Sequence, residues 1–161
     1  MKKLLLLCKL VVAFVFLSST LSLNAQNEVT RQQNCDVNPY QVTADSVKAF
    51  YSQEGYIVLR EASLTMESEY EMPIVLPMNA DTAYQFIFIG DPTSRLYEVR
   101  MFDYSEKQVV YRKTIWGDPD GNIISFNFIP HNSEYYMIKP VQTNKNKKKM
   151  CGYVLLMRKT V

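Results

Sequence analysis

Histidine is almost absent from the sequence, since His131 is the only one among 161 residues. A histidine-based catalytic triad would have to use this residue, which follows Pro130 in a predicted turn. The five glycines form no phosphate-binding loop, and no zinc-ligand motif is present. We therefore expect a non-catalytic protein without a cofactor. The 16 acidic residues leave a carboxylate-dependent hydrolase as an alternative, because such an enzyme needs only one suitable pair of carboxylates.

Long apolar runs are absent after residue 25, so no transmembrane segment is expected once the N-terminus is removed. Residues 1–25 have the three parts of a secretory signal peptide: Lys2 and Lys3, an apolar core over residues 4–17, and a cleavage point after Ala25. We expect export to the periplasm, the outer membrane or the medium. Cys8 raises the alternative of a lipoprotein signal, but leucines instead of small residues precede it.

A strong charge of either sign is also absent, because the net charge is +2. Without Lys2, Lys3 and Lys9, 15 basic residues face 16 acidic ones, which leaves a charge of about −1. Such a balance disfavours nucleic acid as a partner. The basic run TNKNKKK before the last predicted strand is interpreted as a solvated loop, with a local contact to acidic lipid headgroups or polysaccharide as the alternative; its candidate binding residues are Lys147, Lys148 and Lys149.

Cysteine is scarce, and only Cys35 and Cys151 remain after the predicted signal peptide. Exported proteins meet an oxidising compartment, so we predict a disulfide between these two residues. Two separate thiols, one of them buried, are the alternative.

The rest of the chain predicts one mainly β domain. Residues 26–42 are expected to form a polar N-terminal segment, and residues 43–161 a single domain. The domain begins with a short helix from Thr43 to Glu54, ended by Gly55. From Tyr56 onward, about eight apolar segments of period two alternate with turn residues. This pattern is typical of an antiparallel β-sandwich or jelly roll.

The alternation within the strands predicts their position in the sheets. The segment YQFIFI, residues 84–89, is apolar on both faces and is expected to be a central strand. The last strand, which contains GYVLLM, is also expected to be largely covered. The segment IISFNF, residues 123–128, alternates apolar with polar side chains and should have one wet face.

The stretch from MPIVLPMNADTAYQFIFIGD to the C-terminus resembles the small bacterial jelly-roll modules typified by the pre-peptidase C-terminal domain. The segments that carry the resemblance are ADTAYQFIFIG, EYYMIK and GYVLLMRK, over roughly 90 residues. The turn from His131 to Glu134 departs from the family pattern, and we expect no protease domain before the module. The resemblance implies a non-catalytic accessory or binding role.

Two further patterns suggest ligands. GDPDGN places Asp118, Asp120 and Asn122 at the spacing of the first ligands of a calcium loop, although the later glutamate is missing, and the same residues suit a tight turn. Trp116 beside it could stack on a sugar, or simply pack. MESEYEMP places Glu67, Glu69 and Glu71 at alternate positions, where they could bind a cation or a basic partner, or lie on a solvated edge.

These observations favour an exported binding or scaffold module of the bacterial envelope or the extracellular space. An envelope protein or a glycan is the expected partner, and a calcium- or glycan-binding module or a carboxylate-dependent hydrolase are the alternatives.

Overall fold

The computed structural model describes residues 30–33, 35–36, 38–119, 121–147 and 149–160, so the predicted signal peptide lies outside the described residues. The described residues form one helix and nine strands, and no helix among them is long and apolar enough to cross a membrane. The elements are β1 Thr30–Gln33, α2 Asn38–Gln53, β2 Tyr56–Glu67, β3 Ile74–Met78, β4 Tyr84–Ile89, β5 Leu96–Phe102, β6 Gln108–Ile115, β7 Ile123–Phe128, β8 Glu134–Thr143 and β9 Lys149–Lys159.

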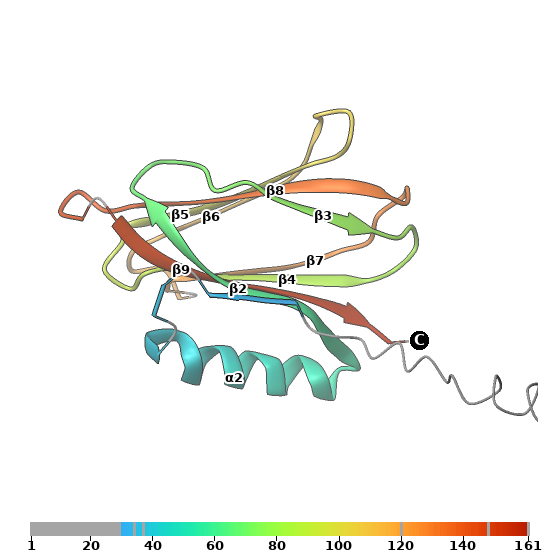
Figure 1. The fold of residues 1–161 in the computed structure, drawn as a ribbon, viewed down its shortest axis with the longest axis horizontal. Coiled ribbons are helices and arrows are strands. Elements are labelled where there is room, and N and C mark those ends of the chain that lie inside the picture. The colour runs from blue at the N-terminus through green and yellow to red at the C-terminus, as the bar shows by residue number, and fades with distance from the viewer. Residues whose placement is uncertain (1–29, 34, 37, 120, 148, 161) are drawn as a thin grey trace, which may run out of the picture.

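Two sheets pack face to face, as Figure 1 shows. The first has the order β1-β2-β9-β4-β7, and the second has the order β3-β8-β5-β6. From β2 onward, the strands form nested antiparallel pairs, with β2 on β9, β3 on β8, β4 on β7 and β5 on β6. This nesting is the jelly-roll arrangement, so the predicted fold class is confirmed. One strand was not predicted. It is β1, which lies in the segment expected to be polar and pairs in parallel with β2.

The strand positions follow the predicted patterns. β4 lies between β9 and β7, and all six of its residues are buried. β9 lies between β2 and β4 and is buried over most of its length. β7 is the edge strand of its sheet, and Ser125 and Asn127 face solvent on one side of it.

The predicted helix is present, but it begins at Asn38 and not at Thr43. Its apolar side chains recur at helical spacing and cover the outer face of the five-stranded sheet, below the sandwich in Figure 1. Tyr40 is buried there, stacks on Tyr153 of β9 and donates a hydrogen bond to the carbonyl of Cys151 at 2.7 Å. These contacts extend the helix into the polar segment. Gly55, at φ 84°, ends the helix in the left-handed conformation that glycine tolerates best.

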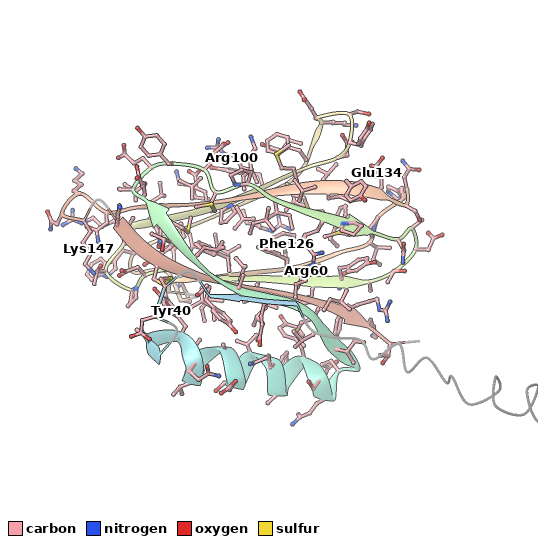
Figure 2. The ribbon with its side chains drawn as sticks, viewed as in Figure 1. Tyr40, Arg60, Arg100, Phe126, Glu134 and Lys147 are labelled. Atoms are coloured by element: carbon pink, nitrogen blue, oxygen red, sulfur yellow. A yellow bond between two sulfur atoms is a disulfide. The ribbon has the colours of Figure 1, made fainter. Side chains whose placement is uncertain are left out.

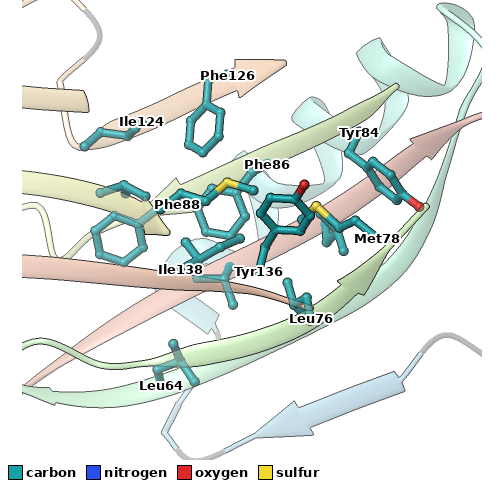
Figure 3. Close-up of a cluster of buried hydrophobic side chains, with 14 of the residues drawn as sticks. Leu64, Leu76, Met78, Tyr84, Phe86, Phe88, Ile124, Phe126, Tyr136 and Ile138 are labelled. Carbon is teal, nitrogen blue, oxygen red and sulfur yellow. The ribbon is translucent and has the colours of Figure 1, made fainter. Parts of the chain in front are cut away.

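The main core lies between the two sheets, and a smaller core lies between the first sheet and α2. Figure 3 shows part of the main core, where Phe86 and Phe126 approach each other with ring centroids 5.4 Å apart. Each fully buried side chain of this kind stabilises the fold by roughly 1.5–3 kcal/mol. The outer face of the β3-β8-β5-β6 sheet has no helix over it among the described residues.

The predicted disulfide between Cys35 and Cys151 is confirmed, with the two Cα atoms 6.1 Å apart. It joins the segment between β1 and α2 to the beginning of β9. The backbone of Cys35 is also held by the hydroxyl of Ser63, which donates to the Cys35 carbonyl at 3.0 Å and accepts from its N–H at 3.3 Å.

Candidate functional site

Four loops meet at one end of the sandwich: those after β2, β4, β6 and β8. In Figure 2 this end carries Lys147, on the left. Several hydrogen bonds join the loops. Ser68, after β2, donates to the carbonyl of Asn144 at 3.0 Å and accepts from its N–H at 2.9 Å. Asn144 in turn donates from its side-chain amide to the carbonyl of Thr93 at 2.9 Å. The loops are therefore held to one another by fixed polar contacts.

Asp91 is the centre of this network and is buried at 8% exposure. Its Oδ1 accepts from the backbone N–H of Thr93 at 2.8 Å and from the Thr93 hydroxyl at 2.6 Å. Its Oδ2 lies 3.3 Å from the Nζ of Lys147, so one lysine of the basic loop is an internal ion-pair partner. The Asp91 carboxylate thus fixes the loops after β4 and β8 relative to each other.

Gln142 and Tyr97 support this network from below. Gln142 is fully buried, and its Oε1 accepts from the N–H of Asp91 at 2.8 Å while its Nε2 donates to the carbonyl of Cys151 at 3.1 Å. The hydroxyl of Tyr97 donates to the carbonyl of Asp91 at 2.8 Å. Burial, and secondly the charge of Asp91, raise the pKa of Tyr97 to about 12. Tyr97 therefore remains a hydrogen-bond donor over the whole physiological range.

Gly90, which follows β4 directly, is required because the backbone passes close to the ring of Tyr97 at this point. A Cβ at this position would lie 2.4 Å from the ring of Tyr97, which is itself 1% exposed. The backbone can therefore pass over Tyr97 only if residue 90 has no side chain.

A pocket of about 600 Å³ opens above this scaffold. Trp116 stands at the pocket with 73% of its surface exposed. The backbone N–H of Trp116 donates to the backbone carbonyl of Arg95 at 2.9 Å, so the two residues are neighbours where β6 ends and β5 begins. The lining residues are Pro92, Thr93, Arg95, Ile115, Trp116, Asn144 and Asn146.

The turn after β6 fixes the backbone beside Trp116. The Oδ2 of Asp118 accepts from the N–H of Ile115 at 2.8 Å. Asn122 holds the other end of the turn, since its side-chain amide donates to the carbonyl of Gly90. The tryptophan is therefore exposed on a constrained backbone.

Two polar side chains of the pocket are available to a ligand. Arg95 and Asn146 are both exposed, and neither side chain makes a hydrogen bond or ion pair within the described part of the chain. Arg95 is the one charged residue among the described residues that line the pocket. An aromatic face, a guanidinium and an amide around one hollow can hold a flat apolar surface together with acceptor groups.

The pKa of Asp91 reflects its position. Burial alone raises the pKa of this carboxyl, but the hydrogen bonds from Thr93 and the ion pair with Lys147 outweigh burial and bring the pKa below its usual 3.8. A carboxyl whose pKa is lowered by folding stabilises the native state above its unfolded pKa. This contribution is lost as the pH falls through the lower native value.

The variant Asp91→Asn should therefore be less stable than the wild type at pH 7, by about 1–2 kcal/mol, because neutral asparagine weakens the charge-assisted bonds. The difference should shrink below about pH 4, where the wild-type carboxyl becomes protonated. Thermal melts between about pH 2 and pH 7 measure both effects. Asp81→Asn is the matched control, since Asp81 is exposed and makes no side-chain hydrogen bond among the described residues. Parallel curves for wild type and Asp91→Asn would contradict the assigned role.

The predicted calcium ligands are only partly described. Asp118 and Asn122 hold the turn, as given above, and Asp120 lies outside the described residues. Within the described residues, no three histidine, cysteine, aspartate or glutamate side chains are grouped closely enough to hold a metal ion. The calcium site stays a prediction.

The three predicted glutamates do not share one strand face. β2 ends at Glu67, and Glu69 lies in the following turn with φ 72°. Glu71 pairs with Lys139 at 2.8 Å and with Arg100 at 3.1 Å, over the outer face of the second sheet. The alternation of side chains between the two strand faces therefore ends at this turn. Glu71 lies apart from Glu67 and Glu69, because its two ion pairs hold it over the second sheet. A binding role for these glutamates stays a prediction.

The basic loop lies beside the pocket. Lys147 pairs with Asp91, Lys149 begins β9 opposite Glu67, and Lys148 lies outside the described residues. The structure thus brings Trp116 and the lysine loop, two separate sequence predictions, to the same end of the molecule. His131 is exposed in the loop after β7, at the other end of that strand from the pocket.

Arg95, Thr93 and Asn146 also line the pocket, and nothing in the sequence predicted them as site residues. The segment DPTSR could have indicated an exposed turn, but nothing in its spacing indicates that it lies beside Trp116. That neighbourhood depends on the pairing of β5 with β6 and on the loop after β8.

Comparison with known proteins shows only a general structural similarity. No protein-family model matches the chain, and no curated protein is significantly similar in sequence. The lysozyme inhibitor PliG of Aeromonas hydrophila, a periplasmic inhibitor of g-type lysozyme, is 9% identical with a TM-score of 0.47, over 81% of this chain and 97% of that one.

Two other solved structures are similar over shorter stretches. The adhesin domain of Lys-gingipain from Porphyromonas gingivalis is 12% identical with a TM-score of 0.41, over 62% of this chain and 74% of that one. A CBM4 structure is 12% identical with a TM-score of 0.40, over 66% and 79%. All three are β-sandwich modules. At this level of similarity, none of them bears on what this chain binds.

Proposed function

We propose that this protein is an exported, non-catalytic module that binds a carbohydrate in the pocket beside Trp116. The observation that carries the proposal is the exposure of this tryptophan, 73%, over a pocket of about 600 Å³ with a rigid floor. An exposed tryptophan at a hollow is a favourable surface for the apolar face of a sugar ring, because it offers a large flat area with little conformational entropy to lose.

The polar network below the pocket supports the same function. Asp91, Gln142 and Asn144 hold the loops through buried hydrogen bonds. Loops fixed before binding need not lose further entropy when a ligand arrives, so a shallow pocket can still bind specifically.

The charge of the pocket favours an acidic saccharide. The guanidinium of Arg95 has no partner within the described residues, and its planar donors match a carboxylate or a sulfate. Lys145 and Lys149 are exposed in the adjacent basic loop and its junction with β9, and add positive potential at this end. Acidic polysaccharide is the local partner that the sequence of this loop already suggested.

An exported location agrees with the disulfide, since such bonds persist mainly outside the cytosol. The expected signal peptide and the resemblance to pre-peptidase C-terminal modules, which implies an accessory role, are consistent with the same placement. We propose the bacterial envelope or the extracellular space as the site of action.

Binding to immobilised polysaccharides, followed by calorimetry on the best oligosaccharide, tests the proposal. The variant Trp116→Ala should weaken binding at least roughly thirtyfold, because the central aromatic of an interface contributes about 2 kcal/mol or more. The variant Arg95→Gln should weaken binding to uronic-acid oligosaccharides and spare neutral ones.

The matched control is Tyr104→Ala, since Tyr104 is 75% exposed in the loop between β5 and β6, away from the pocket. This variant should bind like the wild type. Saccharide binding that survives Trp116→Ala, or that Tyr104→Ala weakens equally, would place the contact elsewhere on the surface.

A further inference from the structure

A second hollow lies between the two sheets, along the side where β2 faces β3. It is a cleft of about 330 Å³. Its walls are apolar and come from both sheets: Ala62, Leu64, Leu76, Phe86, Val154 and Leu156 line it. Figure 3 shows two of these side chains, Leu64 on β2 of the first sheet and Leu76 on β3 of the second. The cleft is separate from the pocket beside Trp116, with which it shares no lining residue.

One cation lies at this cleft. Arg60 lines the cleft and is exposed, which places it at the rim. The register of β2 shifts between Val58 and Arg60, and beyond this irregularity Arg60 pairs with Leu156, a core residue at 4% exposure. Arg60 therefore lies on the same strand face as Ala62 and Leu64, which points into the sandwich. Its apolar stem can follow the wall while the guanidinium stays at the rim.

The charge of Arg60 is not neutralised within the described part of the chain, where its side chain makes no ion pair or hydrogen bond. Its neighbour Glu61 faces the opposite side of the sheet, toward α2, and pairs there with Lys48 at 3.3 Å while accepting from the hydroxyl of Tyr153 at 2.8 Å. An apolar cleft with one unpaired cation at its rim is thus complementary to a molecule with an apolar chain and one anionic end.

We propose that this cleft binds the acyl chain of a medium-chain carboxylic acid, with the carboxylate on Arg60. The apolar side chains of both sheets receive the chain, because covering a hydrocarbon chain with them removes apolar surface from water. The guanidinium of Arg60 donates two parallel hydrogen bonds to the carboxylate oxygens. The cleft volume is at the lower end of the range of ligand sites, about 300–1,000 Å³, which favours a medium chain over a long one.

Calorimetry of the full-length mature protein with hexanoate, octanoate and decanoate tests the chain. Affinity should rise roughly threefold to fourfold for each added methylene until the cleft is filled. Decanol tests the headgroup, since it has the same chain without the charge, and it should bind at least roughly tenfold more weakly than decanoate.

Two variants locate the site. Arg60→Gln should remove the preference for decanoate over decanol, and Ala62→Leu should fill the cleft and weaken both ligands. Arg112→Gln is the matched control, because Arg112 is an exposed arginine on β6 that bonds only to its neighbour's carbonyl in the described structure. Thermal melts establish that each variant is folded.

Each outcome decides the proposal. Decanoate binding that depends on Arg60 and Ala62, but not on Arg112, supports it. If decanoate gives no binding heat with folded wild-type protein, the proposal is overturned. It is also overturned if Arg60→Gln and Ala62→Leu both bind decanoate as the wild type does. Binding lost equally in Arg112→Gln would indicate nonspecific attraction to surface charge and would also overturn it.

Discussion

Replacing Cys35 and Cys151 together with serine should lower the free energy of unfolding by about 4 kcal/mol. The disulfide closes a loop of 116 residues in sequence separation, and restriction of the unfolded chain by so long a loop is worth up to about 4–5 kcal/mol in the chain-entropy account. The melting temperature should fall by roughly 10–20 °C, as the free-energy change for a chain of this size implies. Denaturant unfolding of both proteins measures the effect.

Reduction supplies the control for this experiment. The wild type with reductant should unfold like the double variant, and the double variant should not respond to reductant. Tyr40 and Ala44 still bury their side chains on the sheet without the disulfide, so the helix should remain in circular dichroism spectra of the variant. A double variant as stable as the oxidised wild type would show that contacts around Ser63 and Tyr40 already hold the N-terminal segment in place.

The second large effect is expected from Gln142→Leu, which should cost about 2–4 kcal/mol. The substitution keeps the approximate size of the side chain and removes its polar atoms. The N–H of Asp91 then loses its acceptor in a buried position, and an unpaired buried group costs about 1–3 kcal/mol by itself. The bonds to the Ser94 hydroxyl and the Cys151 carbonyl are lost as well.

This variant also links stability to the pocket. The loop after β4 would lose its anchor to β8, so saccharide binding should weaken even though Gln142 does not line the pocket. Gln108→Leu is the control, since Gln108 is exposed at the start of β6 and should change stability by no more than about 0.5 kcal/mol. Denaturant unfolding and saccharide calorimetry on both variants check the two effects. Equal stability of Gln142→Leu and wild type would mean that water replaces the amide.

The fold was largely predictable because its signals are local. The two apolar faces of residues 84–89 and the single wet face of residues 123–128 follow from side-chain alternation, and both strands lie where this pattern indicates. The helix start was wrong, because the position of Asn38 depends on Tyr40 packing against Tyr153, more than 100 residues away. A polar composition cannot reveal a contact of that range.

The candidate site shows the same limit. Trp116 and the lysine loop were each noticeable as residue types, but their meeting at one end depends on strand pairing. Arg95 had no distinguishing neighbour in sequence. Glu71 was grouped with Glu67 and Glu69 because the three alternate in the sequence. In the structure, a turn at Glu69 interrupts this alternation, and Glu71 pairs with Lys139 instead. Residue spacing predicts contacts within a strand, whereas this pocket is formed by three loops.

The nested strand pairs have a consequence for the order in which the chain assembles. The β5–β6 hairpin is closed by the five residues 103–107, whereas the β4–β7, β3–β8 and β2–β9 pairs enclose progressively longer segments. Loop closure costs more entropy for longer segments, so we expect the hairpin to nucleate and each pair to shorten the loop that the next must close. Cys151 lies on β9 within this outermost pair, and Cys35 precedes β2, so their thiols meet only when the sandwich is complete. Oxidation of this pair would then mark molecules that have finished folding and would lock the chain in its native register at that moment.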